Sequence, residues 1–103
     1  RMKNLAELQK MMKAAQEFQE KMQKELAQMQ VEGSSGGGMV TVTLDGHKNC
    51  LKIKLEPEVV SKEDVDMLQD LIVSAFREAA ARVDEEVSRK MSGFTGGLKI
   101  PGL

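Results

Sequence analysis

Hydrophobic residues repeat with helical spacing near the start of the chain. Residues 4–29 lack Gly and Pro and carry apolar side chains three and four positions apart, which predicts one long helix. The apolar stripe follows two seams, formed by Leu5, Met12, Gln19 and Leu26 and by Leu8, Ala15, Met22 and Met29. A helix of this length measures roughly 40 Å, more than a compact domain of this size can cover. We therefore expect a second copy of the chain to cover the remainder.

The pattern then changes to strict alternation. Aliphatic residues occupy every second position in two short runs, which are Val40, Val42 and Leu44, then Leu51, Ile53 and Leu55. Alternation on both sides of Asp45-Gly46 predicts a β-hairpin over residues 39–45 and 50–56 with one buried face. Because neighbouring residues of a strand point to opposite faces, we expect Ile53 to face the core and Lys52 to face solvent.

A second helix is expected after the hairpin. Ser61 and Asp64 have the spacing of a capping box, which predicts a helix beginning at Ser61. A broad apolar stripe of helical period follows, and Gly93 is expected to end it. A short strand within residues 30–35 would complete the order helix, three strands, helix. We therefore predict an α+β fold, an α-β-β-β-α subunit with an antiparallel three-stranded sheet and a C-terminal helix.

Size and composition limit the kinds of function. The 103 residues suit one domain, which we place at residues 1–92, followed by a flexible Gly-rich tail at residues 93–103. With 3 Phe, no Trp and no Tyr, base stacking on aromatic side chains is not expected. No apolar window approaches the length of a membrane span. The first residues, with Glu7 and no apolar run, match neither a signal nor a transit peptide, so we expect a cytoplasmic protein without a membrane partner.

Three features that could carry chemistry have simpler structural explanations. Residues 33–38 are Gly-rich but precede a strand and lack a following Gly-Lys-Ser/Thr, so we interpret them as a link where backbones approach closely. His47 is the only histidine and lies in the hairpin turn. Cys50 is the only cysteine, which excludes an intrachain disulfide and a Cys-rich metal site. We predict no enzyme activity, no metal, no cofactor and no small-molecule substrate; a small hydrolase or thiol enzyme is the least favoured hypothesis.

Basic residues gather on one side of the first predicted helix. At about 100° per residue, an arc of about 80° contains Lys3, Lys10, Lys13, Lys21 and Lys24. Glutamates share this polar side, and i,i+4 spacing favours pairs such as Lys13–Glu17 and Glu20–Lys24. The second helix repeats this mixture around Arg82, Arg89 and Lys90. Since the net charge is −1, charge alone does not indicate a nucleic-acid partner. A phosphate-binding stripe and a solvated ion-pair face both stay open.

A series of short stretches makes the chain similar to a known family. In chain order they are Met2-Lys3-Asn4-Leu5, Met11-Met12-Lys13, Ala15-Gln16, Gly36-Gly37-Gly38-Met39-Val40-Thr41-Val42, Asp45-Gly46-His47 and Met67-Leu68-Gln69-Asp70-Leu71-Ile72-Val73-Ser74-Ala75-Phe76. Their order and spacing resemble the YbaB/EbfC family of small bacterial nucleoid-associated proteins. The resemblance implies a homodimer built through the sheets, with long first helices projecting like the arms of tweezers. It also implies DNA binding that alters DNA conformation, on the nucleoid in the cytoplasm.

Our leading hypothesis is a non-enzymatic nucleoid-associated protein that binds DNA as a homodimer, mainly through phosphate contacts. The candidate DNA-binding residues are Lys3, Lys10, Lys13, Lys21, Lys24, Arg82, Arg89 and Lys90. The alternative is a protein-interaction adaptor that uses the Met-rich seam of the first helix or the C-terminal tail. A gel-shift titration across salt separates the two hypotheses, because the adaptor predicts no shift with DNA at low salt.

Overall fold

The computed structural model describes residues 4–95 and shows two helices joined through three strands. In chain order, the elements are α1 (Leu5–Gln28), β1 (Val31–Ser35), β2 (Val40–Leu44), β3 (Cys50–Leu55) and α2 (Val65–Thr95). Short 3-10 turns, η2 (Gly36–Gly38) and η3 (Pro57–Val59), follow β1 and β3. The predicted α-β-β-β-α order is confirmed, and each strand begins and ends within about one residue of its predicted bounds.

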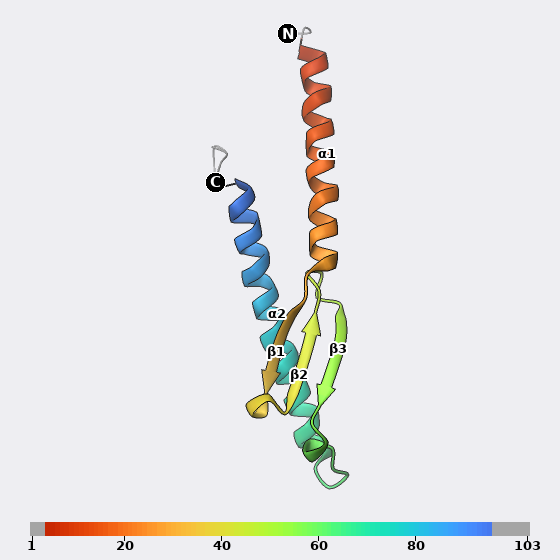
Figure 1. Ribbon diagram of the computed structural model, residues 1–103, viewed down its shortest axis with the longest axis vertical. Coiled ribbons are helices and arrows are strands. Elements are labelled where there is room, and N and C mark those ends of the chain that lie inside the picture. Colours follow the sequence, from red (N-terminus) through yellow and green to blue (C-terminus); the bar gives the residue numbers. More distant parts are fainter. Residues whose placement is uncertain (1–3, 96–103) are drawn as a thin grey trace.

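The strands form one antiparallel sheet in the order β1-β2-β3 (Figure 1). At the centre, Val42 pairs with Gly33 of β1 and with Ile53 of β3. The register between β2 and β3 shifts at Thr43/Leu44, where Leu51 is the extra residue of a bulge in β3. Alternation along β2 turns its aliphatic side chains to a single face, where all of them are buried.

Helix α2 packs on that face, across β1 and β2. The core between helix and sheet consists of small and β-branched residues, including Ala75, Ala79 and Val83 of α2. Gly33 permits the close approach, because a Cβ atom there would lie 2.2 Å from the backbone N of Ala79 and 2.6 Å from the carbonyl O of Ala75. The glycine of β1 therefore fits against the helix backbone itself, as expected for a strand glycine.

Strand β3 lies largely outside the cover of α2. Ile53 shares a face with its partner Val42, yet 45% of Ile53 is exposed while Val42 is fully buried. Leu51 is likewise about half exposed. The prediction that Ile53 enters the core is therefore wrong for the single chain, because α2 packs on β1 and β2 rather than β3. An apolar strip along β3 stays open.

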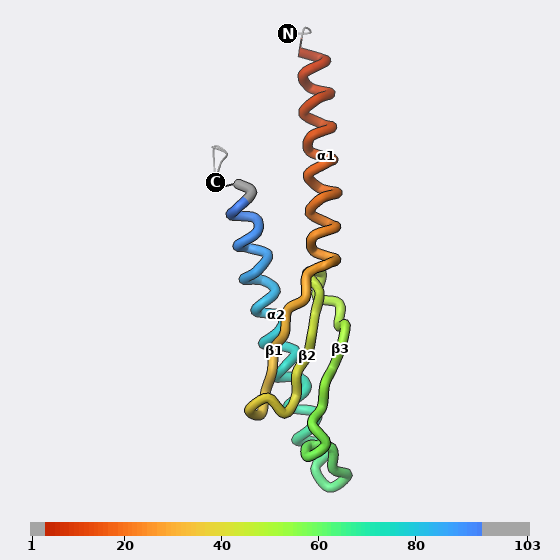
Figure 2. The backbone as a smooth tube through the Cα atoms, viewed as in Figure 1, coloured from red at the N-terminus to blue at the C-terminus, as the bar shows by residue number. Residues whose placement is uncertain are grey.

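Helix α1 projects away from the sheet and makes the molecule long and narrow, 73 × 21 × 16 Å (Figures 1 and 2). Its C-terminal end is held to the body: Met22 is buried, and the N–H of Gly46 in the hairpin loop donates to the carbonyl O of Leu26 at 2.8 Å. Farther out, at least half of each of these side chains is exposed: Leu5, Leu8, Met11 and Met12. The predicted long helix with an apolar stripe beyond its own domain is confirmed.

The start of α2 differs from the prediction. The helix begins at Val65, and the hydroxyl of Ser61 accepts a hydrogen bond from the N–H of Glu63 at 3.3 Å in a preceding turn. The first helical bond runs from the N–H of Leu68 to the carbonyl O of Asp64. Asp64 therefore immediately precedes the helix, whereas the capping-box spacing placed its beginning at Ser61.

The end of α2 also differs from the prediction. The helix continues through Gly93 to Thr95. An exposed glycine costs a helix only about 1 kcal/mol relative to alanine, so one glycine does not stop a long helix. Residues 96–103 of the predicted tail lie outside the described residues.

Candidate nucleic-acid interface

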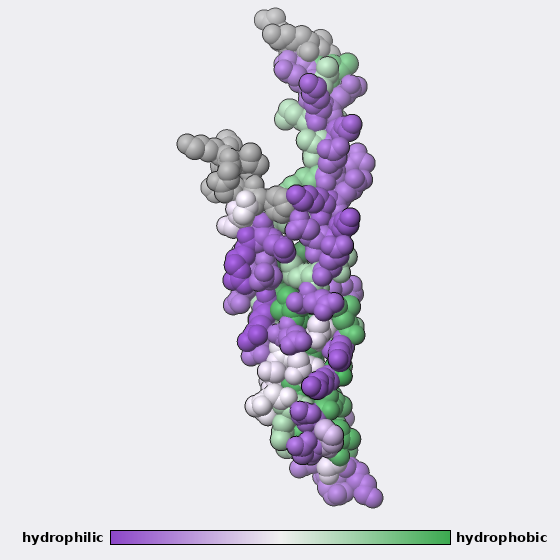
Figure 3. All heavy atoms as spheres, viewed as in Figure 1, coloured by the Kyte–Doolittle hydropathy of each residue, from purple (hydrophilic) through white to green (hydrophobic). Residues whose placement is uncertain are grey.

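The described lysines of α1 lie on the face opposite its apolar stripe. Helical spacing groups them on one side, and each is exposed, namely Lys10, Lys13, Lys21 and Lys24. Figure 3 shows hydrophobic residues along the left of the upper part of α1, toward α2, and hydrophilic residues along its right. The predicted basic stripe is therefore exposed along the projecting helix. Lys3 lies outside the described residues.

Three of these lysines differ from the ion-pair interpretation of α1. Within the described part of the chain, Lys10, Lys13 and Lys24 take part in no ion pair. The expected i,i+4 pairs with Glu17 and Glu20 are therefore not formed. An exposed pair gains little in water and loses side-chain entropy, so the spacing alone does not bring the charges together.

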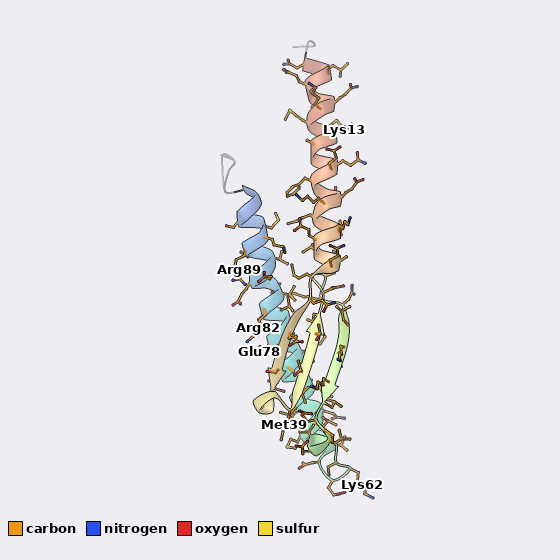
Figure 4. All side chains as sticks on the ribbon, in the orientation of Figure 1. Lys13, Met39, Lys62, Glu78, Arg82 and Arg89 are labelled. Atoms are coloured by element: carbon orange, nitrogen blue, oxygen red, sulfur yellow. The ribbon has the colours of Figure 1, made fainter. Side chains whose placement is uncertain are left out.

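The basic residues of α2 are engaged by acceptors from the same chain. Arg82 places Nη2 3.9 Å from Glu78 Oε1, and its Nη1 donates to the carbonyl O of Glu32 at 3.3 Å (Figure 4). Arg89 donates from Nη2 to Glu86 Oε1 at 2.5 Å. This hydrogen bond lowers the pKa of the Glu86 carboxyl and raises the pKa of Arg89. Sequence spacing correctly predicted the Arg82 pair and predicted Glu85 as the partner of Arg89.

A cleft between the lower part of α1 and α2 collects most of these charges. Its volume is about 830 Å³, and Lys90 contributes to its wall by forming an ion pair with Glu25 of α1. The charged lining consists of four acidic and three basic side chains: Glu25, Glu32, Glu85, Glu86, Arg82, Arg89 and Lys90. Because acids outnumber bases, this cleft does not favour a phosphate. The predicted site therefore divides into exposed arm lysines and a neutralised cluster on α2.

The hairpin loop is built around Asp45, a role that the sequence analysis missed. Its Oδ1 accepts hydrogen bonds from the N–H groups of His47 at 2.8 Å and Asn49 at 2.9 Å. The Asn49 backbone contact is the main cause that lowers the pKa of Asp45. Asp followed by Gly is typical of turns that the aspartate side chain closes, so the signal was present. His47 lies in the turn, as predicted.

Other sites are absent from the described residues. Among residues 4–95, no group of three or more His, Cys, Asp or Glu is arranged to hold a metal ion. Cys50 is exposed on β3. None of the described helices has the length and hydrophobicity needed to cross a membrane.

Comparisons with known proteins agree with this architecture. The model of the YbaB/EbfC DNA-binding family matches residues 2–98. A nucleoid-associated protein of Koribacter versatilis is 46% identical over 96 residues, covering 93% of this chain and 95% of the relative. A nucleoid-associated protein of Clostridium acetobutylicum is 49% identical over 96 residues, covering 90% and 86%. The crystal structure of an uncharacterized Helicobacter pylori protein shares the fold, with a TM-score of 0.71 and 21% identity over 88% of this chain and 94% of that one. This chain belongs to the YbaB/EbfC DNA-binding family.

Proposed function

We propose that this protein is a non-enzymatic, nucleoid-associated DNA-binding protein that acts as a homodimer on the nucleoid of the bacterial cytoplasm. Family membership and the names of the relatives support DNA as the partner. The observation that carries the proposed site is the state of Lys10, Lys13 and Lys24. They are exposed on a projecting helix and form no ion pair among the described residues, so phosphates can approach them without displacing a carboxylate.

The open face of β3 supports the homodimer. Leu71 of α2 packs near Gly36 beyond β1, and Phe76 lies about 140° farther around the helix, on the flank nearer β3. Phe76, Ile53 and Leu51 are each more than one third exposed. An apolar surface between an edge strand and its covering helix is typical of a subunit interface. A second copy of the chain buries this surface in our proposal.

Dimerisation also explains how a protein of near-zero net charge binds DNA. Two subunits present two projecting α1 helices, and the lysines of both reach one duplex in our proposal. Contacts to phosphates hold the DNA without reading its bases, so binding is steeply dependent on salt and similar across sequences. Arms that straddle a duplex also favour one DNA shape over others, which is the proposed basis of an altered DNA conformation.

Salt titration tests the phosphate contacts. Changing Lys10, Lys13 and Lys24 together to Gln should leave α1 helical and weaken binding to unrelated duplexes equally. Each lost contact should remove about 0.9 from the slope of log affinity against log salt. The matched control changes Arg82 and Arg89 to Gln, and it should alter the slope less because both are engaged by acceptors of the chain. An unchanged slope in the lysine variant, or no binding by the parent at low salt, would contradict the proposal; the second result favours the adaptor.

Sedimentation tests the dimer separately from DNA. Ile53→Asn places a polar group in the proposed interface, whereas Lys52→Asn changes the neighbouring position on the other face of β3. At micromolar concentration, the parent and Lys52→Asn should sediment as dimers, and Ile53→Asn should shift toward the monomer. Equal behaviour of the two variants would place the interface elsewhere, and a monomeric parent would overturn the homodimer.

A further inference from the structure

The apolar stripe of α1 beyond the body of the protein has no cover among the described residues. More than half of Leu5, Leu8 and Met12 is exposed, although all of them lie on one side of the helix. Next to them, a shallow hollow at Ala15 is bordered by Met12 and Gln19. A continuous apolar face on a polar helix marks a surface that another segment contacts.

We propose that residues 98–103 of this chain dock along this stripe and brace α1. The position of α2 supports this assignment. Lys90 contacts Glu25 of α1, and α2 continues from there to Thr95, about 7 Å farther along its axis. Because the two helices run in opposite directions, α2 ends beside the middle of α1, below its exposed tip (Figure 1). The chain therefore leaves α2 next to the uncovered stripe.

The remaining length matches the stripe. From the level of about residue 20, where α2 ends, to Leu5 the helix measures roughly 22 Å. Residues 96–103 span up to about 26 Å when extended, so they can follow the stripe to its outer end. Gly96 and Gly97 come first and give the chain freedom to turn onto α1.

The chemistry of the segment also matches the stripe. Leu98 and Ile100 flank Lys99, so an extended chain turns the two aliphatic side chains to α1 and the charge to solvent. Pro101 opposes a helix here, and Leu103 supplies a third apolar group. The arm lysines lie on the opposite face of α1, so docking leaves them accessible. The inference concerns the protein alone and does not depend on DNA binding.

A spin label on the segment tests the docking without DNA. In a Cys50→Ser background, Gly102→Cys carries a nitroxide, and the amide signals of the full-length isotope-labelled protein are recorded. The label should broaden signals from residues 5–15, which include Leu8 and Met12. Mixing spin-labelled, isotope-free chains with unlabelled isotopic chains shows whether the docked segment comes from the same subunit or its partner; the proposal expects the same subunit. Broadening absent from residues 5–15 would overturn it.

Paired variants test the contact by a second measurement. Leu98→Ser with Ile100→Ser should abolish the broadening and speed amide exchange in residues 5–15, by about tenfold if about 1.4 kcal/mol of local stability is lost. The control Lys99→Ser, in the same segment, should change neither. Equal effects of both variants would overturn a contact through the aliphatic side chains. Exchange in α1 that slows with protein concentration and ignores both variants would mean that a second copy covers the stripe, which also overturns the proposal.

Discussion

Lys90 near the end of α2 lies 3.4 Å, Nζ to Oε1, from Glu25 near the end of α1. The two residues are 65 positions apart in the sequence, so the pair ties the projecting arm to the helix that covers the sheet. Both side chains are about one third exposed, at 35% and 29%. Water therefore screens the attraction, and the contact sets the position of the arm more than the stability of the fold.

A double-mutant cycle should show weak coupling in this pair. We expect Glu25→Gln and Lys90→Gln to interact by less than about 1 kcal/mol in the free energy of unfolding, measured by urea titration. The coupling should shrink further in high salt, because exposed charges are screened. A coupling above about 3 kcal/mol, unaffected by salt, would show that the pair is shielded from water in solution.

Gly33 and Gly93 should respond in opposite ways to alanine. A Cβ atom at Gly33 would meet the backbone of Ala79 at 2.2 Å, so Gly33→Ala must separate β1 from α2 and should cost about 3 kcal/mol or more. Nothing lies within 4 Å of a Cβ atom at Gly93, so Gly93→Ala should stabilise α2 by up to about 1 kcal/mol. Thermal melts monitored by circular dichroism compare the two. Similar shifts for both variants would mean that β1 does not contact α2 as closely as described.

Local patterns predicted the elements and their faces, but not the contacts between distant parts. Alternation correctly assigned Ile53 to the face of Val42, yet only the path of α2 across β1 and β2 decides that Ile53 stays exposed. Helical spacing likewise grouped the basic residues of α1. It could not show that Glu25 pairs with Lys90, because that contact depends on how the second helix returns beside the first.

The hairpin loop should make stability depend on pH. Hydrogen bonds, chiefly from the N–H of Asn49, hold the pKa of Asp45 below 3.8 in the folded state. The unfolded chain therefore binds the proton more readily, and the loop contribution is complete above pH 3.8 and lost as pH falls through the lowered pKa. Comparing urea unfolding of the parent and Asp45→Ala, we expect the largest difference near neutral pH and a smaller one in acid. A difference that stays constant down to about pH 2 would contradict this role.

Glu17 lies within the basic stripe of α1, about 40° around the helix from Lys13 and from Lys21. If the stripe meets phosphates, this carboxylate repels them. Two like charges about 7 Å apart in water repel by about 0.6 kcal/mol, so Glu17→Gln should strengthen DNA binding by about threefold per arm at low salt. Fluorescence anisotropy with a short labelled duplex measures the change.

Glu58→Gln is the control for this prediction, because it removes the same charge from η3, at the end of the molecule away from the tip of α1 (Figure 1). It should leave the affinity nearly unchanged. The gain from Glu17→Gln should also fade as salt rises, since screening weakens the repulsion that the substitution removes. Equal effects of the two substitutions would mean that only the overall charge matters, and DNA would then not lie along α1.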